Sequence, residues 1–548
     1  MAGVAATITL STRLNGWLVG VVGLSEVDSM VVGGTLSNIT PDTRGFQPLE
    51  LEYGIRGSGP TDRVAGAGTL TFALNNSASN SAGEAGSYTP GHANAIAGWD
   101  LGSEIILKIT YDGTDYYKFT GSLISIQPDA GQYKRQAVLC TAVDYMDDLA
   151  RSKIKTVAIQ TNKRADQLIG TIVSDAMKKQ PTATSYATGQ STFVTSFDNL
   201  KTNETTCLAA INSVVLSELG YCYVKGDTTQ GGVLTFEDRH ARPKKGAASA
   251  TFNNTMQALS AVRTRKNMLN GVFVIVHPRT TDGSATVLYK LTTTALSPAV
   301  PAGSSIRMNC PLKESTISAY RVAASSITTP LSGTDWVANA SADGTGTNLT
   351  SSVTVTVVKP AANSIEIEIA NAHATSTAYL TTLQLQGIAV RDITETVISA
   401  IDESSAFKYG EIDSRIDMVY ESNAGEFGNE LAKWILNIYK DPVFVVDEFT
   451  IASNKSDYLM THSLAREPGD KITFSEAMTG IAATGASGAE IGYFINGVKM
   501  SIKVPGTIHT SWVLAPASSQ AAWVLSGPPG PELTGSSELG ITTNLGFA

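Results

Sequence analysis

Residues 117–150, YKFTGSLISIQPDAGQYKRQAVLCTAVDYMDDLA, contain the unit around which the fold is organised. Residues 119–126 are rich in β-formers, PDAG at 128–131 breaks the run, and residues 134–143 alternate again as a second strand. Asp144 then stands where the strand gives way to a helical segment, in the position of an N-cap with two more acids in the first turn. The stretch therefore predicts a β-hairpin that leads into a short helix, a scaffold unit without catalytic chemistry.

The composition favours a β-rich protein with large contact surfaces. The chain has 548 residues, which suggests three or four domains, and 42% of them are hydrophobic. Only 16% are charged, against about 25% in average proteins. The net charge is −9 and no basic run is interleaved with aromatics, so we expect no dedicated nucleic-acid groove. The densest basic cluster, at residues 242–245, is predicted to be a solvated surface loop.

The cysteines and the N-terminus carry no targeting or redox signal. The four cysteines have no CxxC spacing, which favours buried free thiols over a disulfide or a metal site. Residues 1–17 lack the basic and apolar regions of a signal peptide. No apolar run reaches about 18 residues, so we expect no membrane span and a protein made in the cytoplasm.

The first third of the chain predicts a small antiparallel β module. Alternating strands at 49–53, 68–74 and 104–111 join the opening hairpin in a sheet of five to seven strands, most simply a barrel. Residues 75–98 are long, polar and without any strand or helix period, so they are predicted to be a loop that makes contacts.

Three helices and an insertion follow. Apolar residues at helical spacing predict helices at 164–179 and 203–219, the second ended by Gly220, with a hairpin over 221–238. The clearest helix is 428–439, which Asp-Pro stops. Residues between about 295 and 390 have the strand spacing of an inserted β-sandwich.

Catalytic and metal-binding patterns are missing. The chain contains no HExxH, GxSxG, Walker A or GxGxxG signature. The run EDRH at 237–240 is better explained as a structural salt bridge, the acids at 144–148 as a helix cap rather than a cation site, and SADGTGT at 341–347 lacks the acid series of a calcium loop. No histidine lies within five residues of another. We therefore predict no catalytic residues, no metal and no cofactor.

Four aromatic or imidazole side chains are the candidates for contacts between subunits. Tyr88, His92 and Trp99 lie in or next to the 75–98 loop, where we expect them on the surface. Trp336, in the predicted sandwich, is the fourth. Tyrosine and tryptophan bury a large area at a small entropic cost, which suits them to interfaces.

The order of segments resembles that of siphophage tail-tip hub proteins, relatives of the baseplate hub of contractile-tailed phages. Residues 102–109, 116–126 and 135–150 resemble the first domain of that family, and the strand and loop at 70–92 resemble its Leu-Asn-Asn to Tyr-Thr-Pro-Gly segment. Further segments that resemble the family are 217–240, 363–390, 409–417, 427–442 and 467–517. The resemblance covers most of residues 45–517.

This resemblance implies a fold that is mainly β with α+β parts: two barrel-like antiparallel β domains, a small helix-hairpin domain and an inserted β-sandwich. The implied division is an N-terminal arm (1–45), a first barrel-like domain (46–155), a helix-helix-hairpin domain (156–257), a second barrel-like domain (258–292 plus 391–425), the sandwich (293–390), a C-terminal α+β domain (426–516) and an extended docking tail (517–548).

The resemblance also implies a structural virion protein at the tail tip. Such hubs are homotrimers that adapt a six-fold tail tube to a three-fold tip, with the distal tail or tail tube protein, the tape measure protein and a central fibre or other tip proteins as partners. DNA would pass through the channel without sequence-specific binding. One alternative is a host-surface carbohydrate-binding or adhesion protein acting through the 293–390 sandwich, with Trp336 and Tyr320 as its aromatics. A tail-associated hydrolase is the other, and no nucleophile can be named for it.

Overall fold

The computed structural model describes residues 4–517, apart from 15–35, 45–46, 131–135, 156, 202, 254–255, 266–267, 292–296, 314–322, 362–363, 393–394, 423–425, 443, 476–491 and 505. The expected N-terminal arm is thus described in part, and the expected docking tail lies outside the described residues apart from residue 517. Several mostly antiparallel sheets and few helices make up the fold, which confirms the predicted mainly β class.

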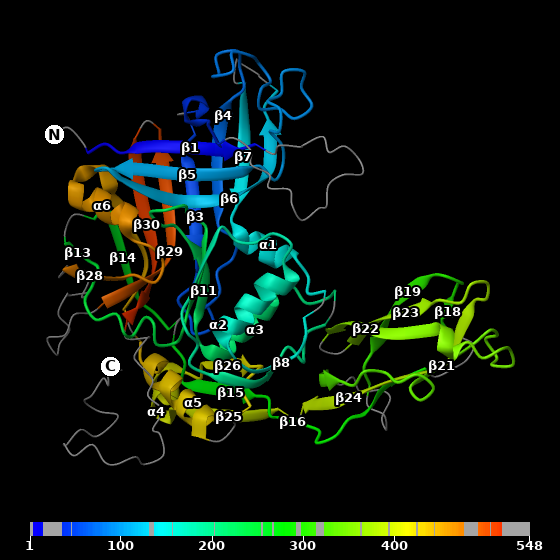
Figure 1. Cartoon of the computed structure of the whole chain (residues 1–548). Coiled ribbons are helices and arrows are strands. Elements are labelled where there is room, and N and C mark those ends of the chain that lie inside the picture. Colours follow the sequence, from blue (N-terminus) through cyan, green and yellow to red (C-terminus); the bar gives the residue numbers. More distant parts are fainter. Residues whose placement is uncertain are drawn as a thin grey trace.

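One sheet of 13 strands brings together the two ends of the chain (Figure 1). Its N-terminal half has the order β3-β4-β7-β6-β5-β1-β2. The strands are β1 (Thr7–Arg13), β2 (Leu36–Asn38), β3 (Leu49–Gly54), β4 (Thr69–Asn75), β5 (Glu104–Tyr111), β6 (Thr114–Pro128) and β7 (Ala137–Val143). The hairpin predicted from residues 117–143 is confirmed as β6 and β7, which pair antiparallel.

The C-terminal half has the order β14-β27-β30-β29, with β28 and β13 branching from β29. Its strands are β13 (Ala250–Asn253), β14 (Ala258–Arg263), β27 (Phe444–Ala452), β28 (Lys471–Ser475), β29 (Gly492–Lys503) and β30 (Thr507–Pro516). The halves meet where β29 pairs with β3, from Gly497 opposite Gly54 to Ile502 opposite Leu49. Segments more than 400 residues apart therefore share one backbone ladder.

Aromatic side chains fill the core beneath the C-terminal half. The ring centroid of Phe449 lies 5.0 Å from that of Phe252, 4.8 Å from that of Phe474 and 5.5 Å from that of Trp512. Rings at these separations pack with favourable edge and offset contacts as well as burying apolar area. Helix α6 (Asp457–Ala465) adds buried leucine and methionine side chains to the same core.

A helix-hairpin unit follows the first half of the sheet. It contains α1 (Tyr145–Arg151), α2 (Ala165–Thr171), a π-helical turn (Ile172–Ala176), α3 (Cys207–Glu218) and the strands β8 (Gln160–Arg164), β9 (Ala183–Tyr186), β10 (Thr192–Ser196), β11 (Tyr221–Lys225) and β12 (Val233–Glu237). The helices share one buried core with β11 and β12. The apolar face predicted for the first of the two helices is confirmed, since Leu168, Ile169 and Ile172 are all buried.

A three-stranded sheet lies at the lower end of the molecule in Figure 1. Its order is β25-β15-β26, from β15 (Gly271–Val276), β25 (Thr396–Ile401) and β26 (Asp413–Met418), and α4 (Glu403–Tyr409) and α5 (Glu426–Tyr439) belong to the same region. Helix α5 packs against β15 and β25 through Leu431 and Ile435, which confirms the helix predicted at 428–439.

The insertion consists of two sheets around one core. The long strand β24 (Ala378–Asp392) pairs with β16 (Arg279–Thr281), β17 (Thr286–Lys290), β18 (Ala299–Val300), β20 (Ala323–Ile327) and β21 (Trp336–Asn339). The second sheet has the order β19-β23-β22, from β19 (Ser305–Pro311), β22 (Val353–Ala361) and β23 (Ser364–Asn371). Figure 1 shows both sheets projecting from one side of the molecule.

Strand pairing differs from the expected second barrel. The strands within 258–292 go to three different sheets: β14 to the large one, β15 to the three-stranded one, and β16 and β17 to the sheet of β24. The large sheet is completed by strands of 444–516, because their aromatic faces close its core. The domain bounds as such stay a prediction.

Two local details also differ from expectation. The helix predicted at 164–179 changes to a π-helical turn after Thr171 and ends at Ala176. The left-handed residue after α3 is Leu219, with φ 59°, and not Gly220. Gly220 is required for space, since a Cβ there would lie 2.5 Å from the carbonyl oxygen of Glu237.

Candidate functional site

The acids at the start of α1 are used structurally. Asp144 accepts a hydrogen bond from the backbone N–H of Met146 at 3.0 Å, which confirms the predicted N-cap. Asp147 lies 3.4 Å from Arg151, and Asp148 lies 3.3 Å from Lys179. Within the described part of the chain, no group of three or more His, Cys, Asp and Glu side chains is arranged to hold a metal ion.

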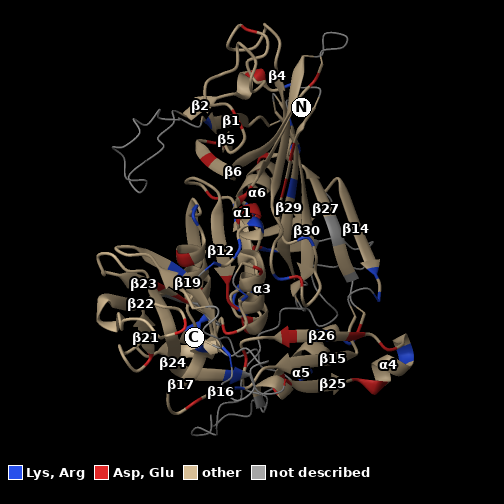
Figure 2. Ribbon diagram, turned by 90° about the vertical axis from the view of Figure 1, so that its right-hand side faces the viewer, with Lys and Arg blue, Asp and Glu red and all other residues tan. Residues whose placement is uncertain are grey.

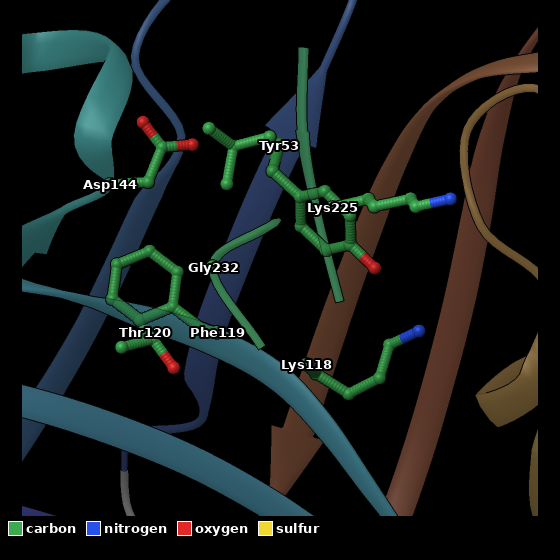
Figure 3. Close-up of a pocket in the computed structure, with 8 residues that line it drawn as sticks. Tyr53, Lys118, Phe119, Thr120, Asp144, Lys225 and Gly232 are labelled. Carbon is green, nitrogen blue, oxygen red and sulfur yellow. The ribbon is translucent and has the colours of Figure 1, made fainter. Parts of the chain in front are cut away.

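A small cavity adjoins this cap (Figure 3). It measures about 10 Å³ and is lined by Tyr53, Lys118, Phe119, Thr120, Asp144, Val224, Lys225 and Gly232. Figure 3 places the carboxylate of Asp144 on one side of the cavity and the ammonium groups of Lys118 and Lys225 on the other. A volume of this size holds about one water molecule, so the cavity is far too small for an organic substrate.

Asp144 is the unusual group of this cavity. Its side chain is 3% exposed, and its Oδ2 atom has no hydrogen-bond partner. Burial raises the pKa of Asp144 to about 7, because the carboxylate loses its hydration there and hydrogen bonding to the backbone offsets only part of that loss. Asp144 is therefore a proton-binding group at neutral pH inside the joint between the large sheet and α1.

A polar cluster, which we call the charged junction, fixes the helix-hairpin unit on the large sheet. Its charged members are Lys118, Glu237, Arg242, Lys245 and Glu467. They come from β6, the end of β12, the turn after it and the loop before β28. All of them are largely buried except Lys245, whose side chain is 38% exposed.

Arg242 is the centre of one half of the charged junction. Its Nε donates to Glu237 at 2.8 Å, and a terminal nitrogen donates to Asn496 of β29 at 2.7 Å. The guanidinium lies 3.6 Å from the ring centroid of Tyr221. Burial alone would raise the pKa of Glu237, but Arg242 and Lys245 outweigh burial and bring that pKa below its ordinary value.

Glu467 is the centre of the other half. It pairs with the buried Lys118 and accepts from the hydroxyl of Tyr53 at 2.8 Å and the backbone N–H of Gly226 at 3.1 Å. Burial, with the negative charge of Glu467, raises the pKa of Tyr53. The hydroxyl of Tyr223 donates to the carbonyl of Pro468 at 2.9 Å. The loop before β28 is thus held by both the sheet and the hairpin.

The charged junction corrects one prediction and refines another. The cluster at 242–245 is not wholly a solvated loop, because Arg242 is fully buried against Tyr221 and Glu237. The run at 237–240 is confirmed as structural, but its members pair elsewhere: Arg239 lies 3.7 Å from Glu218 of α3. Sequence spacing could not reveal these partners, since Asn496 is 254 residues away from Arg242.

Tyr88 and Trp99 shape the 75–98 loop from inside. The hydroxyl of Tyr88 donates to Asp42 at 2.5 Å, and the indole N–H of Trp99 donates to the carbonyl of Tyr88 at 3.0 Å. Their rings meet edge to face at 5.2 Å. Asp42 also accepts from the backbone N–H of Ser81 at 2.7 Å. The loop is thus an ordered element, pinned at its base by one buried carboxylate.

The expected surface position of three contact candidates is wrong. Tyr88 and Trp99 are 1% and 2% exposed, because their polar groups find partners inside the loop, and Trp336 is 4% exposed within the core of the sandwich. His92 is exposed at the loop tip. A role in subunit contacts is untested for all four, and the loop itself remains our candidate contact element through its polar outer residues.

The sandwich offers no exposed aromatic among these candidates. Trp336 is buried, and Tyr320 lies outside the described residues. The 341–347 loop is organised by the Asn339 side chain, which donates to the carbonyls of Gly344 and Gly346 at 3.1 and 2.9 Å. Asp343 accepts from Thr345. The polar groups of this loop are thus used in its own turn.

The four cysteines are buried and free, as predicted. Burial raises the pKa of each thiol, for example that of Cys140 to about 12. Of the described helices, none is both long and apolar enough to span a membrane.

Comparison with known proteins gives structural neighbours only. No family model and no curated sequence matches the chain. A tail protein from Neisseria meningitidis MC58 is similar over 93% of this chain and 96% of its own, with 8% identity and a TM-score of 0.44. The 43 kDa tail protein of prophage MuSo2 from Shewanella oneidensis is similar over 94% and 98%, with 10% identity and a TM-score of 0.43.

A third neighbour is an E. coli component of the type VI secretion system, described as structurally similar to the T4 bacteriophage tail proteins gp27 and gp5. It matches over 86% of this chain and 73% of its own, with 9% identity and a TM-score of 0.35. Because these TM-scores lie below 0.5, the similarity carries no function over to this chain.

Proposed function

We propose that this protein is a non-enzymatic structural component of a phage tail. Three copies form a hub at the tail tip that adapts a six-fold tube to a three-fold tip. The observation that carries the proposal is the 13-stranded sheet, which consists of two mostly antiparallel β halves joined edge to edge at β3 and β29.

Two β halves in one chain suit a symmetry adapter. Three copies of such a chain present six β units to a six-fold neighbour while they offer three identical surfaces elsewhere. The charged junction supports the same role, because it holds the helix-hairpin unit rigidly against the sheet. The cavity beside Asp144 holds about one water molecule, so this cavity itself is not a substrate site.

The proposed partners follow from the position in the tail. The distal tail or tail tube protein lies on the six-fold side, and the tape measure protein and DNA pass through the channel. Acidic and basic residues are interspersed over the ribbon in Figure 2, and the net charge is −9. In this proposal the channel wall carries no dense set of cations, so that phosphate does not hold the DNA in place.

The mass and symmetry of the purified protein test this proposal. We expect a native mass three times 57.6 kDa and a three-fold ring with a central opening in electron micrographs. A stable monomer at micromolar concentration, alone and with its tail tube protein, would contradict the hub. Carbohydrate binding by the sandwich remains an outcome to check by glycan array, but no observation favours it, because Trp336 is buried.

A further inference from the structure

One edge of the three-stranded sheet, which we call the bare edge, has no strand partner among the described residues. Strand β25 ends the order β25-β15-β26, and it pairs antiparallel with β15 from Thr396 to Ile401. On its outer side it makes no backbone hydrogen bond to any other described segment. The opposite edge is protected, since α3 packs against β26 and the hydroxyl of Ser217 accepts from the backbone N–H of Tyr420.

The bare edge has the composition of a pairing surface. Its sequence, TVISAI, has no charge, no proline and no glycine, whereas exposed edges in proteins are normally blocked by such residues or by a bulge. Val397 and Ile401 are 46% and 52% exposed, and they alternate on the face turned away from α5. Phe407 on the neighbouring α4 is 95% exposed. Figure 2 shows α4 and β25 at the outer margin of the molecule.

The C-terminal residues of the same chain have the matching pattern. Residues 541–547 read ITTNLGF, without any charge. At the period of a strand, Ile541, Leu545 and Phe547 share one face with Thr543, and the other face carries only polar or small residues. An uncharged strand of this kind is the natural complement of an uncharged edge, since backbone hydrogen bonds give affinity and alternate side chains give specificity.

The chain can reach the edge. Strand β30 ends at Pro516, and its register with β27, Phe449 opposite Trp512 and Ala452 opposite His509, puts Pro516 at the end of the sheet where β27 begins after α5. The 24 residues 517–540 then connect this point to the segment. Such a length spans at most about 80 Å, and about 27 Å as a flexible coil. Tethering at this length gives a local concentration in the millimolar range, which favours the chain's own segment over a free partner.

We propose that residues 541–547 add to the outer edge of β25 as a fourth strand, within the same chain. The added strand covers Val397 and Ile401 and satisfies the outer backbone groups of β25. This inference is independent of the proposed trimer, because it concerns a single chain. Its test measures the protection of backbone amides in β25, whereas the trimer is tested by the native mass.

Amide hydrogen exchange of the full chain, followed by mass spectrometry, tests the inference. In a chain that stops at residue 539, we expect the peptide containing β25 to exchange at least tenfold faster, while peptides of β15 and α5 keep their rates. A double variant with Ile541→Asp and Leu545→Asp should give the same result, and it does not touch the folded core. Equal exchange of the β25 peptide in full-length, truncated and double-variant chains would overturn the proposal.

Two controls identify the occupant. A synthetic peptide of residues 540–548 at millimolar concentration should restore protection to the truncated chain, and a scrambled peptide should not. Protection in the full chain should persist on dilution below the concentration at which copies associate. Protection that disappears on dilution would mean that a neighbouring copy donates the segment, which contradicts docking within one chain.

Discussion

At the scale of single residues, burial affects the pKa of Asp144 more strongly than the helix-capping hydrogen bond does. Capping normally stabilises an ionised aspartate, but here one carboxylate oxygen is buried without a partner, and burial raises the pKa to about 7. In the unfolded chain the group titrates near about 3.9. Between these two pH values the folded protein holds a proton that the unfolded chain has lost, so this group lowers stability as the pH rises.

The variant Asp144→Asn should therefore flatten the pH dependence of stability. Asparagine caps helices about as well as aspartate and cannot ionise. We expect its melting temperature, relative to wild type, to rise between about pH 4 and pH 7 and then to level off, with a free-energy slope of up to about 1.4 kcal/mol per pH unit removed. Calorimetry at several pH values measures this, with Asp147→Asn as the matched control. Parallel curves for wild type and Asp144→Asn would show that Asp144 is ionised throughout.

Single residues also show which structural properties the sequence alone can and cannot predict. The cap at Asp144 was predictable, because its signal lies within three residues of chain. The burial of Arg242, Tyr88 and Trp99 was not, since each is buried by partners brought together only by folding, such as Asn496 for Arg242 and Asp42 for Tyr88. A polar sequence without a period predicts that the backbone forms a loop. It does not predict whether the largest side chains of that loop are exposed or buried.

At the scale of elements, the end of α3 combines two opposing effects. Leu219 adopts a left-handed conformation, which costs a non-glycine residue roughly 1–2 kcal/mol. Its side chain is 1% exposed and packs in the core of the α5 region. Losing a buried leucine costs about 2–5 kcal/mol, so packing outweighs strain and explains why glycine does not occupy this position.

Substitutions at Leu219 should reverse the usual helix ranking. Leu219→Ala loses the packing and keeps the strain, whereas Leu219→Gly loses the packing and relieves the strain. We expect both variants to be less stable than wild type, with the glycine variant about 1 kcal/mol more stable than the alanine variant. Thermal or urea unfolding gives the order. If alanine proved the more stable of the two, the left-handed conformation would not persist in solution.

The elements that the sequence predicts are those with a long, regular pattern of apolar residues. The helix α5 and the hairpin of β6 and β7 were predicted because a single stripe or alternation runs through each. The π-helical turn after Thr171 escaped prediction, since its apolar residues keep helical spacing. The pairing partners of strands were not predicted either: β14, β15 and β17 all lie within residues 258–292, and only the fold places them in three different sheets.

At the scale of the whole molecule, the β3–β29 ladder and the charged junction connect parts that the sequence keeps apart. The order of segments along the chain suggests the class of protein, but no periodicity in the sequence predicts that residue 54 pairs with residue 497. The charged junction lies at this connection, because Asn496, next to that pair, holds Arg242. Loss of the charged junction should therefore act on the association of the helix-hairpin unit with the sheet rather than on either core.

Arg242→Ala tests this coupling. The substitution leaves Glu237 buried beside the single partner Lys245 and removes the contact with Tyr221, and breaking a buried pair in this way costs about 3–5 kcal/mol. We expect faster proteolysis between residues 240 and 250 and a separate, earlier melting transition. The double variant Glu237→Gln with Arg242→Met removes both buried charges and leaves only Lys245, whose side chain is 38% exposed, without its carboxylate, so it should recover part of the loss. If Arg242→Ala and the double variant melted together at the wild-type temperature, the helix-hairpin unit would be held by its apolar contacts alone.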